Sequence, residues 1–293
     1  MKIRRYGLAL AAVATASLAI TGCAKKPDSK SGSSPGASGG GVAAKAKSGK
    51  LVIGVKYDQP SLGLKGPNGP EGFDVDVAKY IAKKLGVTDE KNIEFKEAVS
   101  ANRESFLDNG TVDMVIATYS ITAARLPKVT YGGPYIITHQ DIMVRANDSS
   151  IKDLASLKGK NICAVKGSNS WKNITDGTNK LNVKVAAKTV DALGYKDCIT
   201  KLKGGTLDAV STDATILAGF ASQDRALKVV NAPFTDEKYG IGLKKGDLAG
   251  CKAVNDAVTA MYGDGTAKQL WTKWFAKAGL PFDAAVPPAQ GCA

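Results

Sequence analysis

Residues 113–125, with the sequence DMVIATYSITAAR, combine a short apolar run with a cluster of hydroxyl groups and one arginine. The run at 114–117 has the length and β character of one buried strand. A Thr-Tyr-Ser triplet follows it, so we expect hydroxyls at the strand end. Thr122 is placed to cap a helix with Arg125 in its first turn, where the helix dipole already favours anions. A guanidinium beside open N–H groups predicts a carboxylate site, with a solvated surface arginine as the alternative.

The first 22 residues have the pattern of a bacterial export signal. Three basic residues precede an apolar run at 8–20 that is too short to span a bilayer comfortably. The run ends in ITGC, and Cys23 resembles the lipidated cysteine of bacterial lipoproteins. An ordinary export signal with an incidental cysteine is the alternative. No later stretch has the length and hydropathy of a transmembrane helix, so we expect attachment to the outer face of the cell membrane by lipid alone.

Residues 23–48 are expected to form a disordered linker. Beyond Cys23 this segment consists largely of Ser, Gly, Ala and Lys, with almost no large apolar side chain to bury. The remaining chain is long enough for one large domain or two small ones.

The chain is basic, with a formal net charge of +13. Basic tracts often indicate nucleic acid binding, but these lysines are scattered and an exported protein meets no genome. We therefore expect no nucleic acid partner and interpret the charge as favouring anionic ligands and an anionic envelope.

Four cysteines remain when Cys23 is set aside, an even number that suits an oxidising compartment. Three pairings are possible. We favour Cys163–Cys198 and Cys251–Cys292, because each pair then stays within one of the two lobes described next. Metal binding by the four thiols is the alternative, although the chain has no CxxC spacing.

Apolar segments of strand and helix type alternate along the chain, which favours an α/β fold. Strands are expected at residues 51–55, 93–95, 114–117, 161–165, 183–186 and 209–210. Helices are expected at residues 73–85, 103–109, 154–157, 192–202, 253–262 and 268–275. Extended crossings are expected at residues 135–144 and 229–234.

Both halves of this series contain a strand, a polar loop and a second strand that ends in hydroxyl and charged residues. We therefore predict two Rossmann-like lobes joined by a hinge of two chain crossings. Lobe one would comprise residues 49–138 and 236–293, and lobe two residues 139–235. Open α/β sheets bind ligands at the carboxyl ends of their strands, so the site is expected in the cleft between the lobes.

Six motifs in register over about residues 50–280 carry a family resemblance. They are GFDVDVA at 72–78, GTVDM at 110–114, SITAAR at 120–125, VKGSNS at 165–170, LDAVSTD at 207–213 and YGI at 239–241. The chain resembles the polar amino acid-binding proteins of ABC importers, which have the type II periplasmic-binding-protein fold. The lipoprotein cysteine, YDQP at 57–60 and the four further cysteines are most similar to glutamate-binding lipoproteins of high-GC Gram-positive bacteria.

The resemblance implies a site for an amino acid zwitterion. Arg125 matches the arginine that grips the ligand α-carboxylate, and Asp213 matches the acid that takes the α-ammonium. One charge of each sign is physically required, because desolvating either unpaired costs several kcal/mol. Ser120 and the backbone at Ala117 and Thr118 match groups that also contact the α-carboxylate and the α-ammonium of the ligand.

The second lobe and the side-chain pocket follow from the same comparison. Asn169 and Ser170 match the loop that closes over the carboxylate, although the family more often has Thr there. Lys56 and Lys166 match positions that reach the ligand side chain in glutamine-binding relatives. Lys56 replaces an acid, which favours a γ-carboxylate over an amide. The remaining candidate ligand contacts are Asp58, Arg103 and Tyr239, with core packing as the alternative for Tyr239.

Two acids near the start of the 73–85 helix, Asp74 and Asp76, are expected to stabilise its N-terminus rather than contact ligand.

The inventory of catalytic residues argues against an enzyme. His139 is the only histidine, and no G-x-S-x-G, H-E-x-x-H or phosphate loop occurs. We expect a monomeric binder of glutamate, or of aspartate, that needs no metal or cofactor and docks on an ABC permease. The alternatives are a glutamine or asparagine binder, a receptor-type sensor lipoprotein, and a cyclohexadienyl dehydratase-like enzyme on the same fold.

Overall fold

The computed structural model describes residues 40–292. The export signal, Cys23 and most of the predicted linker lie outside the described residues. Within residues 40–292, no helix has both the length and the apolar character needed to cross a bilayer.

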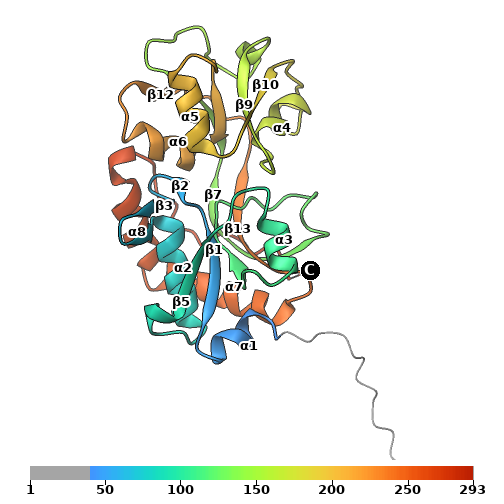
Figure 1. The fold of residues 1–293 in the computed structure, drawn as a ribbon, viewed down its shortest axis with the longest axis vertical. Helices are drawn as coiled ribbons and strands as arrows, with labels where there is room; N and C mark the ends of the chain where they lie inside the picture. The colour runs from blue at the N-terminus through green and yellow to red at the C-terminus, as the bar shows by residue number, and fades with distance from the viewer. Residues whose placement is uncertain (1–39, 293) are drawn as a thin grey trace, which may run out of the picture. The chain divides into compact units, whose positions relative to one another are not determined.

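Lobe one is built on a five-stranded sheet with the order β5-β1-β6-β13-β7 (Figure 1). Strands β5, β1 and β6 are parallel, and β13 runs antiparallel to both β6 and β7. Their bounds are β1 Leu51–Val55, β5 Ile93–Glu97, β6 Met114–Val115, β7 Val129–Thr138 and β13 Glu237–Lys244. A small antiparallel sheet beside it contains β2 Asp58–Gln59, β3 Gly63–Gly66 and β4 Gly69–Glu71.

Lobe two contains a parallel pair, β9 and β10, and an antiparallel sheet with the order β11-β8-β12. Their bounds are β8 Gln140–Arg145, β9 Asn161–Val165, β10 Lys188–Ala192, β11 Val210–Asp213 and β12 Leu227–Val229. A bridge between Ile162 and Ala209 links the two sheets. The chain crosses between the lobes where β7 passes into β8 and again in the segment from β12 to β13.

Eight α-helices in the described part of the chain cover these sheets. They are α1 Val42–Lys47, α2 Phe73–Lys84, α3 Arg103–Asp108, α4 Ser170–Thr175, α5 Tyr195–Lys203, α6 Ala214–Ala221, α7 Leu248–Gly263 and α8 Thr266–Phe275. Short 3₁₀ helices lie at Glu90–Asn92, Ala155–Leu157 and Ala276–Ala278.

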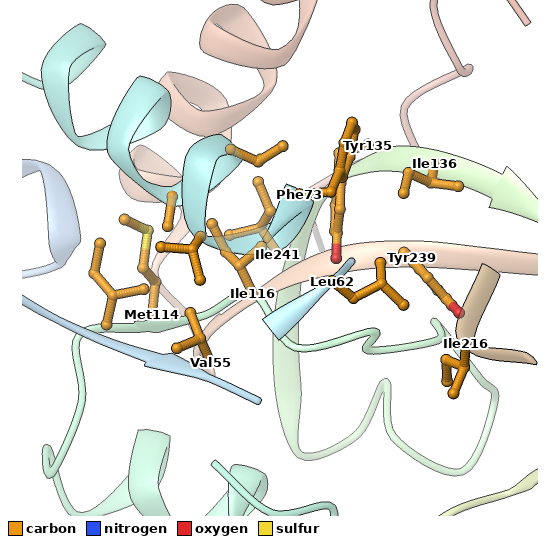
Figure 2. Close-up of a cluster of buried hydrophobic side chains, with 14 of the residues drawn as sticks. Val55, Leu62, Phe73, Met114, Ile116, Tyr135, Ile136, Ile216, Tyr239 and Ile241 are labelled. Carbon is orange, nitrogen blue, oxygen red and sulfur yellow. The ribbon is translucent and has the colours of Figure 1, made fainter. Parts of the chain in front are cut away.

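The segment that opened the sequence analysis is buried on both sides. Met114 and Ile116 belong to the large core cluster that also contains Phe73 and Tyr135 (Figure 2). Val115 and its neighbour Ala117 lie in a separate cluster on the side of α3. Successive side chains of a strand point to opposite faces, so this short run joins the two layers of lobe one.

Three local predictions are wrong. Residues 42–47 form α1, whose Val42 and Ala46 are buried, so the predicted disordered linker ends before this helix. Residues 123–128 form turns, and the predicted helix after Thr122 is absent. Pro127 accounts for this, because the residue before a proline is disfavoured in helical conformation.

The third wrong prediction is the strand at 183–186, a segment without strand structure. The partner of β9 is β10, a few residues further on. Val185 is buried without joining a sheet, so its apolar character comes from core packing.

Both predicted disulfides are present, Cys163–Cys198 in lobe two and Cys251–Cys292 in lobe one. The alternative of a metal site built from these four thiols is therefore wrong. The second disulfide ties the C-terminal segment to α7, and the backbone N–H of Gln290 donates to the carbonyl of Gly133 in β7.

Candidate functional site

The chain leaves β6 through a tight, buried turn centred on Thr118. Thr118 has φ 45°, a left-handed conformation that is uncommon outside glycine. Its backbone N–H donates to Oδ2 of Asp74 over 2.9 Å, and the hydroxyl of Tyr135 donates to Oδ1 over 2.8 Å. Burial raises the pKa of Asp74 to about 7 against the opposing effect of these hydrogen bonds. Asp74 therefore fixes the turn, a role beyond the predicted stabilisation of a helix start.

Two guanidinium groups lie against the ring of Tyr119. The central carbon of Arg103 is 4.1 Å from the ring centroid and that of Arg125 is 5.0 Å from it. Arg103 is buried at the start of α3 and donates to the carbonyl of Ala117 over 3.1 Å. Burial, and then the charge of Arg125, lower the pKa of Arg103 to about 10. Positive charge is thus concentrated at this edge of the sheet.

Arg125 joins the two lobes. Its Nη1 donates to the carbonyl of Ser120 over 2.8 Å, within lobe one. Its Nη2 donates to the carbonyl of Gly167 in lobe two over 3.0 Å, and Nη1 reaches Oδ1 of Asn169 at 3.4 Å. Glu104 lies 3.5 Å from Nε.

Lobe two contributes a buried carboxylate, Asp213, at the end of β11. Oδ2 of Asp213 accepts a hydrogen bond from the hydroxyl of Tyr239 over 2.7 Å. Burial, and then the negative charge of Glu237, raise the pKa of Asp213 well above its ordinary value. An unpaired carboxylate is disfavoured in such a place, so a cation bound beside it would be strongly stabilised.

A small cavity of about 10 Å³ lies between these groups. Lobe one lines it with Ser100, Arg103, Thr118 and Ser120, and lobe two with Ser168, Asn169, Ser170, Tyr195, Thr212, Asp213 and Ile216. This space is of the order of one water molecule, so the lobes are closed over the site. A larger cleft of about 880 Å³ lies next to it and shares Ser168 and Asn169 as lining residues.

Six predicted ligand contacts line the small cavity: Arg103, Thr118, Ser120, Asn169, Ser170 and Asp213. Arg125 and Lys166 line the larger cleft instead, and Arg125 reaches the cavity wall through its contacts with Ser120 and Asn169. Lys166 is exposed.

The remaining four predicted contacts line neither the small cavity nor the larger cleft. Ala117 has its carbonyl occupied by Arg103, and Tyr239 orients Asp213. Asp58 lies against the backbone of Lys196 in lobe two.

The fourth, Lys56, lies directly behind the cavity wall. It is buried, and its Nζ donates to Oγ of Ser100 over 2.8 Å. Burial, and then the charge of Arg103, lower its pKa to about 7.

The cavity also contains residues that the sequence did not indicate. Ser168, Thr212 and Tyr195 line it and form a hydroxyl network with the predicted Ser170. Thr212 directly precedes Asp213, so its place in the LDAVSTD motif was an available signal. Ser100 and Ile216 carry no such signal, because they reach the site only through the tertiary fold.

The arrangement presents charged groups of both signs, and no histidine is among the residues that line the described cavity. His139 lies 3.9 Å from Asp141 and is not among the lining residues. Arginine side chains on one side and a buried carboxylate on the other are complementary to a molecule with an anionic and a cationic end. Two lobes that close over such a cavity define an amino acid-binding protein with the type II periplasmic-binding-protein fold.

Comparison with known proteins identifies the family. Residues 51–277 match the model of bacterial extracellular solute-binding proteins, family 3, and the chain belongs to this family. The glutamate-binding protein GluB of Corynebacterium glutamicum is 41% identical over 92% of this chain and 90% of its own length. The ABC transporter glutamine-binding protein GlnH of Bacillus subtilis is 39% identical over 77% of this chain and 81% of its own.

A solved structure supports the fold assignment. An ancestral arginine-binding protein bound to glutamine superposes with a TM-score of 0.70 at 34% identity, covering 78% of this chain and 98% of its own. The protein is therefore an extracellular amino acid-binding component of an ABC uptake system and not an enzyme.

Proposed function

We propose that this protein binds L-glutamate, with L-aspartate as the next candidate, and delivers it to the permease of an ABC importer. The observation that carries the proposal is the position of Lys56 behind Ser100 at the cavity wall. A cation there complements a side-chain carboxylate and leaves Asp213 to bind the α-ammonium. The name and 41% identity of the Corynebacterium glutamicum relative support the same choice.

The charge balance of the site favours a dicarboxylic amino acid. Arg103, Arg125 and Lys56 lie on the lobe-one side, and their mutual repulsion contributes to the lowered pKa values of Arg103 and Lys56. The α-carboxylate neutralises one of these charges, and a side-chain carboxylate would neutralise a second. An amide side chain would leave that second charge buried and unpaired, which is unfavourable.

Closure of the hinge captures the ligand in this proposal. The amino acid first meets the lobe that carries Arg103 and Arg125, and lobe two then brings Asp213 onto its ammonium. Closure is favoured only by the difference in ligand affinity between the closed and open forms. Lys166 and Asn169 contribute from lobe two, and opening at the permease releases the amino acid.

Calorimetric titration with glutamate, aspartate, glutamine and asparagine tests the proposal. We expect glutamate to bind tightest and Lys56→Asp to shift the preference toward glutamine. Lys252→Asp is the matched control, because Lys252 is exposed on α7 and paired only with Asp256 among the contacts of its side chain that the structure describes. Glutamate preference that survives in the Lys56 variant would contradict the specificity argument.

Glutamine is the second candidate, and a specific observation favours it. The pKa of Lys56 is lowered to about 7, so the amine is largely neutral in slightly alkaline solution and can then pair with an amide. The glutamine-binding relative from Bacillus subtilis is nearly as similar as the glutamate-binding one. Tighter binding of glutamine than glutamate at pH 7 would establish this alternative.

We also propose that the protein acts as a monomer anchored by lipid on Cys23. Cys23→Ser should move the protein from the membrane fraction of the producing bacterium into the medium. Retention of this variant in the membrane fraction would argue against a lipid anchor.

A further inference from the structure

The lobes also meet at a second place, whose residues do not themselves line the amino acid cavity. Strand β2 of lobe one lies against α5 and α6 of lobe two (Figure 1). Oδ2 of Asp58 is 3.4 Å from the backbone nitrogen of Lys196, in the first turn of α5. This is long for a hydrogen bond, so the interaction is mainly between the carboxylate and the positive end of the helix dipole. No side chain caps this helix at Gly194.

Two glycines of lobe two lie where lobe one approaches. Gly194 has φ −166°, an extended conformation open to any residue, so its own backbone does not require glycine. A Cβ atom at Gly194 would lie 2.3 Å from Oδ2 of Asp58. That clash is relieved if the aspartate side chain turns away, but the contact with α5 is then lost.

Gly219 presents a more rigid obstacle. It is buried within α6, where glycine is about 1 kcal/mol less favourable than alanine. Outside the helix backbone, the three atoms nearest to a Cβ at this position all belong to Pro60 of lobe one, with the carbonyl oxygen at 2.1 Å. A backbone atom cannot move aside as a side chain can. The absent side chain is therefore explained by the approach of the other lobe and not by α6 itself.

We propose that residues 58–60 of lobe one and the glycines Gly194 and Gly219 of lobe two form a closure contact that sets how firmly the protein retains its amino acid. Asp58 is a positioning residue of the closed form and not a ligand contact. The contact stabilises only the closed form, so it slows ligand release and has little influence on the first encounter. The choice of ligand for the test rests on the proposed function, whereas the contact itself does not.

The decisive comparison is Gly219→Ala against Gly263→Ala. Gly263 is the exposed last residue of α7, and a Cβ there meets no atom within 4 Å. With L-glutamate as ligand, we expect Gly219→Ala to weaken binding by about 5- to 150-fold, the range for overpacking at a tight contact. Stopped-flow measurement of the glutamate dissociation rate should show that the loss of affinity comes from faster dissociation. The melting temperature of the ligand-free protein should be unchanged or higher, because the open form gains helix propensity without a clash.

Wild-type affinity and dissociation rate in Gly219→Ala would overturn the proposal. If this variant misfolds, substitutions of Asp58 provide the test instead. Asp58→Ala should speed dissociation by about two- to fivefold, as expected for a weak charge–dipole contact. Asp58→Asn keeps the size of the side chain but removes its charge, so it should dissociate about as fast as Asp58→Ala, whereas a purely steric role would be restored by this variant. Equal dissociation rates in wild type and both Asp58 variants would contradict the proposal.

Failure of the proposed ligand is distinguishable from failure of the contact. If wild-type protein does not bind glutamate, the ligand assignment fails. The same variants are then measured with whichever of the twenty amino acids raises the wild-type melting temperature most.

Discussion

Replacing Asp213 with asparagine separates binding from folding. The substitution preserves the size of the side chain, and its carbonyl oxygen can still accept from the hydroxyl of Tyr239. Asp213 is the N-cap residue of α6 but makes no side-chain capping hydrogen bond, so no cap is lost. The main change is the removal of one buried negative charge.

The two consequences of Asp213→Asn have opposite signs. With ligand, the ammonium loses its charged partner, and truncating such a pair costs about 2–5 kcal/mol, or roughly 30- to 5,000-fold in affinity. Without ligand, burial and the carboxylate of Glu237 raise the pKa of Asp213 well above 3.8. A raised carboxyl pKa means that stability is fully present below about pH 4 and is lost as pH rises through the folded-state value. The asparagine side chain does not ionise, so the variant does not lose stability in this way as pH rises.

Calorimetry with L-glutamate and thermal melts from pH 4 to pH 8 test both parts. We expect weak or unmeasurable binding, together with a ligand-free melting temperature that gains on the wild type as pH rises. Binding within threefold of wild type would refute the assignment of Asp213 to the ammonium. A variant that loses stability relative to wild type at high pH would refute the electrostatic argument.

Three further substitutions test the lobe-one side of the site. Arg125→Ala should abolish detectable amino acid binding in calorimetry while the protein stays folded by circular dichroism, and near-native affinity would exclude it as the carboxylate ligand. Glutamate affinity should fall as pH rises from 7 to 8.5, because Lys56 has a pKa of about 7 and a bound carboxylate requires its charged form. Lys56→Met should remove this pH dependence of glutamate affinity. If the dependence persists in the variant, it arises from a group other than Lys56. Asp74→Ala should lower the free energy of unfolding by about 2–5 kcal/mol in urea titration, because two buried donors lose their acceptor. A change in the free energy of unfolding below 1 kcal/mol would show that water replaces the Asp74 carboxylate as the acceptor.

Strands with strong apolar patterns were predictable from the sequence. The strands at 51–55 and 161–165 have the predicted bounds, and the run at 114–117 is buried on both faces. In each case local composition and tertiary packing favour the same structure. The whole-chain motifs then led to the two-lobe fold, which no single segment specifies.

The errors occur where local patterns are ambiguous. Helix α6 was not predicted, because its sequence is apolar on all sides and lacks helical periodicity. A turn begins at Thr122, whose carbonyl accepts from the backbone N–H groups of Arg125 and Leu126, but Pro127 disfavours its continuation into a helix. Helix α1 lies in a Lys- and Ala-rich segment, and it is held by Asp247, which accepts from the backbone N–H of Val42.

Arg125 and Asp213, which charge and motif singled out in the sequence, lie beside the small cavity and in its lining, and their roles as ligand contacts stay predictions. Roles that depend on distant partners were not predictable from the sequence. Asp74 binds Thr118 from 44 positions away, and Tyr195 joins the cavity from the start of α5. Asp58 was expected at the ligand, and the structure has it against Lys196.

A crystal structure of the protein grown with L-glutamate would decide whether the two lobes share one zwitterion between them. We predict the ligand nitrogen within hydrogen-bond distance of the carboxylate of Asp213 and the α-carboxylate on the guanidinium side, at Arg125 or Arg103. A ligand bound in the reverse orientation, or one that leaves Asp213 unpaired, would contradict the account.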